Sequence, residues 1–405
     1  MAPFDDLIYD WNNQGSPPAQ RGPVEFDDET LRDGLQSPAV RDPSVEEKIE
    51  LLHLMEALGI HTADIGLPGA GGRPIDNILR LTKEIADNRM RITPNVACRT
   101  LVTDIKPVVE ITQAAGIPVE VCTFIGSSSI RQFAEDWSLE QMLKNTREAL
   151  SFCRDHDLPV MYVTEDTTRA HPETIRALYT EAMDLGAKRL CVCDTVGHAT
   201  PEGTHAVVSF VRELAQAHNP AVKIDWHGHR DRELAIANCL AAIDAGADRI
   251  HATALGIGER AGNAPMDLLL VNCRLLGLID QDLSRLPDYV EAAAKAVGVE
   301  IPHNYPVFGE DAFETGTGVH AAAVIKAYKK GADELADVIY SGVPAHLVGL
   351  SQKIRIGPMS GRSNVIWALE QLDIEVTDDR VEKVLAAGKS SERLLTDDEV
   401  RAAAQ

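Results

Sequence analysis

The chain is short of basic residues. Lysine and arginine together number 39 against 62 aspartates and glutamates, which gives a formal net charge of −23 at pH 7. A surface this acidic repels phosphate backbones and anionic membranes, so we expect no nucleic-acid binding. An anionic small molecule is not excluded, because a local arginine or a metal ion can reverse the potential inside a cleft.

Long apolar runs and paired cysteines are also missing. No apolar run approaches the roughly 18 residues that a membrane-spanning helix needs, so we expect no membrane association. The seven cysteines are odd in number and include no CxxC pair, which favours reduced thiols in a cytoplasmic protein. Residues 1–22 lack the basic start and apolar core of a signal peptide, so we expect an N-terminal arm.

What the sequence does contain is a regular alternation. Between residues 23 and 285, runs rich in β-branched residues alternate with stretches of helical periodicity. The runs begin at residues 23, 61, 91, 117, 158, 188, 222 and 248. Eight such strand–helix units predict a (β/α)8 TIM barrel as the catalytic domain, with a doubly wound open sheet as the alternative. Residues 286–405 lose the strand rhythm, and we expect a mainly helical appendage that acts as a lid or exchanges between subunits.

Polar residues gather where the runs end, and barrels assemble their active sites at that rim. In "WHGHRDRE", His227 and His229 share one face of a strand, which makes both candidate metal ligands. Two neutral imidazoles need an anionic partner to hold a divalent cation well. Asp33, directly after the first run, can supply it, although it could instead cap a helix or pair with Arg32.

The stretch "ALGIGERAGNAP" follows the eighth run. It nearly matches the dinucleotide fingerprint GxGxxA, but a Rossmann unit would be followed by more strands, whereas helices are expected here. Its glycines can instead let the backbone approach a ligand, with Asn263 as an oxygen donor near the metal.

Five segments carry a family resemblance: "FDDETLRDGLQSP", "EDTTR", "DTVGHATPEG", "HGHRD" and "GIGERAGNAPMDLLLVN". Their order resembles the 2-isopropylmalate synthase and homocitrate synthase family, which are metal-dependent TIM-barrel acyltransferases of the Claisen type. The resemblance implies condensation of acetyl-CoA with a 2-oxo acid and one divalent ion (Mg, Mn or Zn). It also implies that Asp33, His227 and His229 hold this ion, with Asn263 close to it.

The resemblance implies further roles within the barrel. Arg32 would lie beside the keto oxygen, with Gln36 in support, and Glu165 would be a catalytic carboxylate. Thr195 would contact the substrate carboxylate, and Glu259 of "GIGERAGN" is a further candidate substrate-binding residue.

The tail carries its own part of the resemblance. "GTGVHAAAVIKA" is similar to the segment whose histidine, here His320, reaches the active site of the neighbouring subunit, and Tyr340 takes the place of a nearby tyrosine. This implies a homodimer with exchanged C-terminal segments. "LLTDDEV" resembles the stretch before a leucine-sensing domain, so we expect no such regulatory domain and no leucine feedback of the usual kind.

Substrate choice is predicted from the pocket walls. Cys122 replaces the histidine usual in isopropylmalate synthases, and with Cys193 and neighbouring apolar residues it favours a branched aliphatic 2-oxo acid. Arg99 could bind the distal carboxylate of 2-oxoglutarate or simply pair with an acid at the rim. We therefore expect 2-isopropylmalate synthesis from 2-oxoisovalerate, a step of leucine biosynthesis, with homocitrate, citramalate or related alkylmalate synthesis as alternatives.

Two other classes stay open. "DGLQ", where "DGEQ" is commoner, is similar to 3-hydroxy-3-methylglutaryl-CoA lyase, which cleaves rather than condenses. A non-catalytic metal-binding barrel is the second alternative, although the intact set of Arg32, Asp33, Glu165, His227 and His229 argues against it.

Overall fold

The structure of the protein is a computed structural model that describes residues 7–13 and 23–405. Most of the expected N-terminal arm lies outside the described residues; the described part contains the 3-10 helix η2 (Trp11–Asn13). From the first strand onward, the chain forms two compact units. The larger one contains the strands and helices up to Gln281 together with Asp288–Glu300, and the smaller one contains Asp282–Pro287 and Ile301–Gln405.

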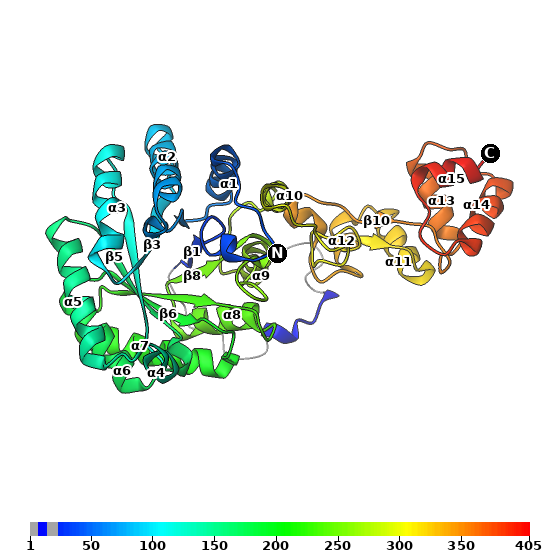
Figure 1. Ribbon diagram of the computed structural model, residues 1–405. Coiled ribbons are helices and arrows are strands. Elements are labelled where there is room, and N and C mark those ends of the chain that lie inside the picture. The colour runs from blue at the N-terminus through cyan, green and yellow to red at the C-terminus, as the bar shows by residue number, and fades with distance from the viewer. Residues whose placement is uncertain (1–6, 14–22) are drawn as a thin grey trace. The chain divides into compact units, whose positions relative to one another are not determined.

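The larger unit is a closed barrel of eight parallel strands surrounded by helices (Figure 1). The strands are β1 (Glu25–Asp28), β2 (Thr62–Asp64), β3 (Thr93–Arg99), β4 (Glu120–Gly126), β5 (Val160–Glu165), β6 (Arg189–Asp194), β7 (Lys223–Gly228) and β8 (Arg249–Ala252). The barrel closes because β1 pairs with both β2 and β8. The TIM-barrel prediction is therefore confirmed, and the doubly wound alternative is wrong.

Helices follow the strands as the periodicity predicts. They are α1 (Val45–Ala57), α2 (Gly72–Asn88), α3 (Val102–Ala115), α5 (Leu139–Asp155), α6 (Pro172–Asp184), α7 (Pro201–His218), α8 (Ala235–Ala245) and α9 (Met266–Leu275). A short extra helix, α4 (Ser129–Glu135), lies between β4 and α5. Ser44 and Glu47 form a capping box that starts α1. Gly246 ends α8 with a φ of 106°, a left-handed conformation that favours glycine.

Helix α10 (Leu286–Val297) belongs largely to the barrel unit rather than to the tail. The hydroxyl of the buried Tyr289 donates a hydrogen bond to Asp28 at the end of β1. The carbonyl of Val297 accepts from the backbone N–H of Arg41 at 2.9 Å. Most of α10 thus packs with the barrel unit, although it follows residue 285 in the sequence.

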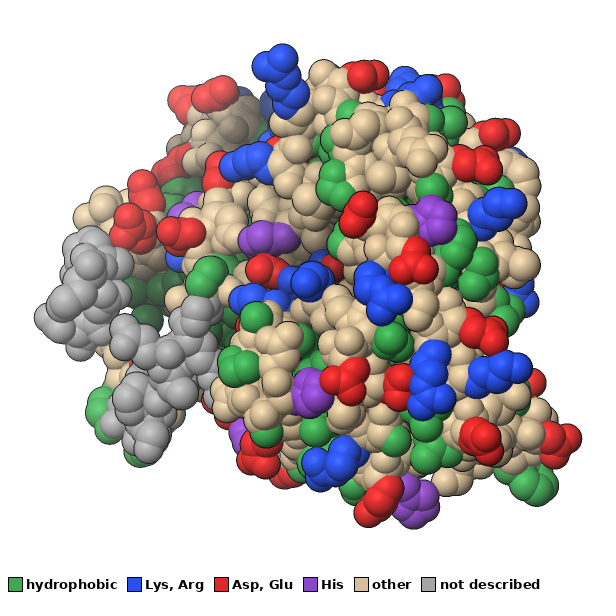
Figure 2. Space-filling model, turned by 90° about the vertical axis from the view of Figure 1, so that its left-hand side faces the viewer, with side chains coloured by type: hydrophobic (Ala, Val, Ile, Leu, Met, Phe, Trp, Pro, Cys, Tyr) green, Lys and Arg blue, Asp and Glu red, His purple; other side chains and the backbone are tan. Residues whose placement is uncertain are grey.

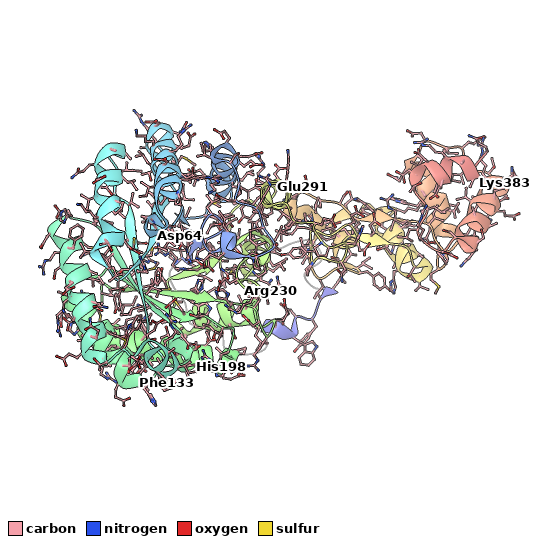
Figure 3. The ribbon with its side chains drawn as sticks, viewed as in Figure 1. Asp64, Phe133, His198, Arg230, Glu291 and Lys383 are labelled. Atoms are coloured by element: carbon pink, nitrogen blue, oxygen red, sulfur yellow. The ribbon has the colours of Figure 1, made fainter. Side chains whose placement is uncertain are left out.

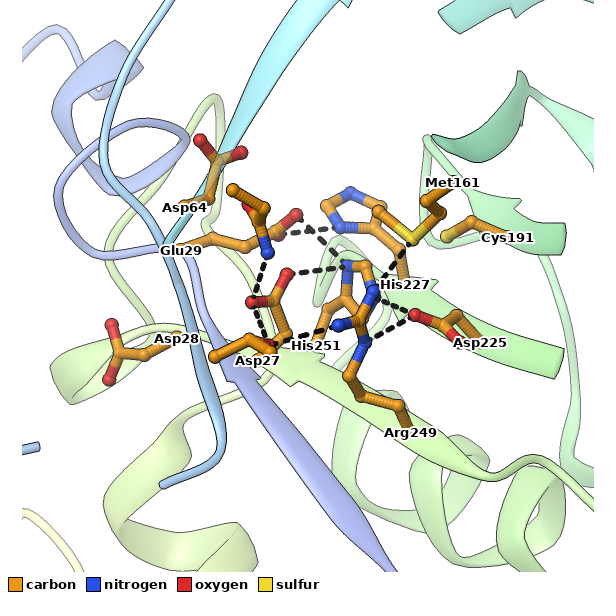
Figure 4. A network of polar contacts seen from close by, with 12 residues as sticks. Asp27, Asp28, Glu29, Asp64, Met161, Cys191, Asp225, His227, Arg249 and His251 are labelled. Carbon is orange, nitrogen blue, oxygen red and sulfur yellow. Dashed lines mark hydrogen bonds and ion pairs between the residues drawn. The ribbon is translucent and has the colours of Figure 1, made fainter. Parts of the chain in front are cut away.

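The inside of the barrel carries charge where barrels usually pack branched apolar side chains. On β8, Ile250 is fully buried toward the helices, while Arg249 and His251 face the opposite side. Nη2 of Arg249 reaches across the barrel to Oε2 of Glu120 on β4 at 2.7 Å, and Nε contacts Asp225 on β7 at 2.5 Å. This charged layer lies beneath the site described below (Figure 4).

The smaller unit is mainly helical, as predicted. Its helices are α11 (Gly318–Tyr328), α12 (Asp333–Val338), α13 (Arg362–Gln371), α14 (Asp378–Ser390) and α15 (Asp397–Ala403). The sequence did not predict the parallel pair formed by β9 (Glu314–Thr315) and β10 (Lys353–Ile354). Two apolar clusters fill the unit, one around Val324 and Ile325 and one around Val365 and Leu369.

Two further features of the molecule are the charge of its surface and the hydropathy of its helices. On the face shown in Figure 2, acidic and basic side chains are interspersed rather than gathered into one patch of a single sign. Among residues 7–13 and 23–405, no helix is both long enough and apolar enough to cross a bilayer.

Candidate active site

A cavity of about 150 Å³, called the site cavity below, opens where the barrel strands end. It is lined by most of the candidate residues found in the sequence: Arg32, Asp33, Gln36, Cys122, Glu165, Cys193, Thr195, His227, His229 and Glu259. They come from the ends of six different strands or the loops after them. The structure therefore brings distant segments of the barrel unit to one place.

Asp33, His227 and His229 form a cluster that could hold a metal ion. One ligand atom from each lies within 4.8 Å of the others, and all three side chains are buried. Asn263 donates from Nδ2 to Oδ2 of Asp33 at 2.6 Å, which leaves its own Oδ1 buried without a hydrogen-bond partner among the described residues. Buried oxygens of this kind are normally satisfied. Two imidazoles, one carboxylate and one amide oxygen form a donor set that fits a divalent cation.

Electrostatics prepare two of these ligands, Asp33 and His229, for a cation, whereas at the third, His227, burial is outweighed by Glu29, which raises the pKa. Burial, followed by the nearby charge of His227, lowers the pKa of His229 to about 4, so its imidazole is neutral at pH 7. Burial alone would raise the pKa of Asp33, but Arg32 outweighs it and the pKa is lowered. A neutral imidazole beside an ionised carboxylate is the protonation state that metal binding requires.

Glycines place Asn263 beside the cluster. Gly262 has a φ of 105°, and a Cβ atom there would lie 1.9 Å from the carbonyl oxygen of Gly256. This close approach allows the backbone N–H of Asn263 to donate to the same carbonyl at 2.9 Å. "GIGERAGN" is thus a tight turn at the barrel rim, after the last barrel strand, and the dinucleotide-fingerprint reading is not supported.

Arg32 is held by three carboxylates. Its Nη2 contacts Glu29 at 2.9 Å, its Nη1 contacts Oδ1 of Asp33 at 2.5 Å, and its Nε contacts Asp64 at 2.6 Å. Burial works against the charge of Arg32, but Asp64, Asp33 and Glu29 raise the pKa of its guanidinium well above the usual value. The local Arg32–Asp33 pair considered above therefore exists, and it leaves Oδ2 of Asp33 facing Asn263 and His229.

Sequence reasoning missed Glu29 and His251, which line the same cavity. Glu29 receives a hydrogen bond at Oε2 from Nδ1 of His227, at 2.7 Å, while its Oε1 lies 3.1 Å from Nδ1 of His251 (Figure 4). Nε2 of His251 lies 3.0 Å from Oδ2 of Asp225. A signal existed, because Asp27 and Glu29 at the end of β1, and Arg249 and His251 on β8, are two residues apart just as His227 and His229 are.

Glu165 and Thr195 lie on the opposite side of the cavity from β1. Burial raises the pKa of Glu165, and Arg131, 3.9 Å away, only partly offsets this. A carboxylate with a raised pKa is a better proton acceptor than an ordinary surface glutamate. The hydroxyl of Thr195 accepts from the backbone N–H of Asp166 at 2.8 Å, which fixes the side chain at the cavity wall.

The remaining wall is apolar and rich in sulfur. Cys122, Met161, Cys191 and Cys193 form a buried cluster against Val163. Burial raises the pKa of the Cys122 and Cys191 thiols well above the usual value, so neither is a ready nucleophile. These cysteines therefore shape the cavity by packing.

Four candidates do not line the site cavity: Asn263, which instead hydrogen-bonds to Asp33, and Arg99, His320 and Tyr340. Arg99 has a side chain 58% exposed, and its Nε and Nη2 bind Asp104 at 2.8 and 2.9 Å, which is the pair with an acid that the sequence left as the alternative. His320 and Tyr340 belong to the smaller unit, where their rings stack with centroids 4.0 Å apart.

A closed parallel barrel with an acid–histidine cluster and a clamped arginine at its carboxyl rim defines a TIM-barrel enzyme class with a candidate metal centre. Residues 23–292 match the family described as HMGL-like. The chain belongs to this family.

Relatives in the family carry different names at similar identity. A homocitrate synthase of Methanopyrus kandleri is 31% identical over 88% of this chain and 85% of its own. A protein of the same organism named probable 2-isopropylmalate synthase is 30% identical over 89% of this chain and 68% of its own. A third carries the name of an (R)-citramalate synthase, at 31% identity over 92% and 69%.

A solved structure shares the fold. The HMG-CoA lyase of Brucella melitensis superposes with a TM-score of 0.56 at 18% identity, over 68% of this chain and 99% of that one. At this identity the likeness concerns the barrel architecture alone.

Proposed function

We propose that this protein is an acyltransferase that condenses acetyl-CoA with a 2-oxo acid. The observation that carries the proposal is the convergence of Asp33, His227 and His229 beside Arg32 in a cavity that also contains Glu165. The synthase names of the relatives support the same reaction class. An inactive barrel would not need this whole set at one rim.

Different residues of the chain bind the substrate and stabilise the developing negative charge. Asp33, His227, His229 and the amide oxygen of Asn263 would hold a divalent cation, which when bound supplies Lewis-acid polarisation of the keto oxygen. Arg32 presents a fixed positive charge to the oxygen that becomes an alkoxide when the new carbon–carbon bond forms. Thr195 donates a hydrogen bond to the carboxylate of the 2-oxo acid.

Proton transfer falls to Glu165, in combination with His320. Glu165 removes a proton from the acetyl methyl group, and the resulting carbanion attacks the keto carbon of the 2-oxo acid. The alkoxide takes up the proton that Glu165 removed, passed on through the Glu165 and His320 pair, to give the tertiary alcohol. Water then cleaves the thioester, which releases the free thiol of coenzyme A and the dicarboxylate product.

The cavity walls favour an aliphatic side chain on the 2-oxo acid. The wall formed by Cys122, Val163 and Cys193 carries no charge. Both ring nitrogens of His251 are engaged by carboxylates, and Arg99 lies outside this cavity. Arg260 lines the cavity but is paired with Asp231, so none of the described arginines there is left unpaired for a distal carboxylate. We therefore assign 2-oxoisovalerate as substrate and 2-isopropylmalate as product.

The smaller unit completes the proposal. His320 and Tyr340 are exposed and stack on each other, as side chains available to a second copy of the chain would be. We assign them to the active site of the partner in a homodimer with exchanged C-terminal segments. Each site would then combine one barrel with the other subunit's tail.

Release of free thiol from acetyl-CoA tests the reaction. The full chain is mixed with 2-oxoisovalerate, 2-oxoglutarate, pyruvate, oxaloacetate or glyoxylate, with and without EDTA. We expect fastest release with 2-oxoisovalerate and loss of release in EDTA that added Mn²⁺ restores. No release with any of the five acids would exclude the condensation.

A further inference from the structure

A second cavity, of about 290 Å³, adjoins the site cavity and is called the side cavity below. Phe124 and Glu165 line both cavities. If the methyl group of a thioester lies at Glu165, the rest of that molecule must leave the site cavity along one of its walls. Because Glu165 lines both cavities, the side cavity is the neighbouring space next to the position of the methyl group.

Two arginines line the side cavity, although the chain as a whole is strongly acidic. Arg99 uses Nε and Nη2 to bind Asp104, and because a guanidinium has five N–H donors, the Nη1 pair stays available to a ligand. Arg131 pairs with Glu135 at 3.0 Å, with both side chains about 40% exposed. Exposed ion pairs of this kind add little stability, so an anion can replace Glu135 at small cost.

The other residues that line the side cavity suit a ligand that is partly apolar and contains amide groups. The guanidinium of Arg131 lies 5.8 Å from the ring centre of Trp137, which holds the charge over a flat apolar surface. Asn145 accepts a hydrogen bond from Gln141 at 2.7 Å, and its own amide N–H groups are left for a ligand carbonyl. Helix α4 carries Arg131 at the barrel's edge, where its neighbour Phe133 is 87% exposed (Figure 3).

We infer that the side cavity binds the coenzyme A arm of the thioester, with its amide-containing chain along Trp137 and Asn145 and its phosphates at Arg99 and Arg131. The inference rests on the proposed function, because it takes Glu165 as the position of the acetyl group. The cavity is slightly smaller than the 300 Å³ or more typical of whole-ligand pockets, so it receives part of the coenzyme. Arg99 then serves the thioester rather than the 2-oxo acid.

Shortened thioesters test this arrangement. KM is measured for acetyl-CoA, S-acetyl-4′-phosphopantetheine and S-acetylpantetheine with the wild type, Arg99→Gln and Arg131→Gln. The control is Arg147→Gln, which removes an arginine of α5 that pairs with Glu181 at 2.7 Å and lines neither cavity.

We expect the ratio of KM for S-acetylpantetheine to KM for acetyl-CoA to fall about tenfold in each of the first two variants, since each loses one charge-assisted phosphate contact. The ratio stays at the wild-type value in Arg147→Gln. Because both thioesters share the acetyl group, any effect of Arg131 on Glu165 cancels in the ratio. Equal ratios in all four proteins would overturn the inference.

Binding without turnover separates the two proposals. Calorimetric titration with free coenzyme A and with pantetheine should show tighter binding of coenzyme A, and the arginine variants should lose that preference. Arginine-dependent binding without any condensation would support the side cavity and reject the proposed reaction. Condensation with equal binding of coenzyme A and pantetheine would reject the side cavity alone.

Discussion

Nδ1 of His227 lies 2.7 Å from Oε2 of Glu29, and both side chains are buried. This hydrogen bond leaves only Nε2 of His227 for a cation and fixes the plane of the ring. The other oxygen of Glu29 lies 2.9 Å from Nη2 of Arg32. One carboxylate thus orients both a candidate metal ligand and the arginine proposed to stabilise the alkoxide.

Replacing Glu29 by glutamine should therefore weaken metal binding. We expect the dissociation constant for Mn²⁺ to rise about 10–100-fold, the usual effect of losing a hydrogen-bond partner behind a histidine ligand. Isothermal titration of the metal-free protein measures it. Glu291→Gln, on the exposed face of α10 (Figure 3), is the matched control. Unchanged Mn²⁺ affinity in Glu29→Gln would show that Glu29 does not orient His227.

Arg32→Lys should separate turnover from metal binding. Lysine keeps a positive charge next to Asp33. Its single ammonium nitrogen cannot replace the three guanidinium nitrogens of Arg32, which contact Glu29, Asp33 and Asp64 at the same time. We expect Mn²⁺ binding within a few-fold of wild type and a loss of thiol release of about 10²–10³-fold. His227→Ala should lose both. Normal turnover in Arg32→Lys would remove the role assigned to its guanidinium.

The barrel could be predicted from the sequence because apolar residues recur with a different spacing in strands and in helices. Each short element shows its own spacing, so the alternation of strands and helices is visible. Asp33, His227 and His229 were found because they end strands, where barrel sites form. Glu29 and His251 were missed although they follow the same alternation. Their burial depends on partners from other strands, and a local pattern treats an isolated charge as a surface residue.

Arg99 shows a second limit of local patterns. Its position at the end of β3 predicted a role at the rim, but Asp104, on α3, turns the side chain away from the site cavity. The position could be read from the strand pattern, whereas the direction of the side chain could not.

The contribution of Asp28 and Asp64 to the stability of the barrel unit should fall as the pH rises from about 4 to about 7, whereas His229, with its pKa lowered to about 4, contributes in the opposite direction. Burial raises the pKa of Asp28 from its ordinary value of 3.8 to about 7, and burial does the same for Asp64. Within this window the folded state holds protons on both carboxyl groups that the unfolded state has released, so their contribution to the free energy of unfolding decreases with pH. Above pH 7 both states are ionised and the slope disappears.

Asp28→Asn should remove about half of this slope, because Asp64 keeps its share. The amide oxygen of asparagine can still accept from the hydroxyl of Tyr289. Urea unfolding at pH 5 and pH 7.5 measures the difference, with Asp87→Asn on the exposed surface of α2 as the control. An identical decrease in Asp28→Asn and wild type would mean that Asp28 is already ionised at pH 5 in the folded protein.

Sharing of active sites between subunits can be tested by mixing two inactive variants. His320→Ala leaves the barrel intact and removes a side chain of the smaller unit, whereas Arg32→Lys does the reverse. If each site combines one barrel with the partner's tail, a mixed dimer has one site in which both residues are intact. Random mixing makes half of the dimers mixed, so about one quarter of wild-type thiol release should return.

The controls decide how this result is interpreted. Each variant alone, taken through the same dissociation and reassociation, should stay inactive, and a pair of His320→Ala with Tyr340→Phe should not recover because both changes lie in the same unit. Recovery only in the cross-unit pair locates His320 opposite the partner's Arg32. If dimers form and the cross-unit pair stays inactive, His320 acts within its own chain or not at all, and the proton transfer must rest on Glu165 without it.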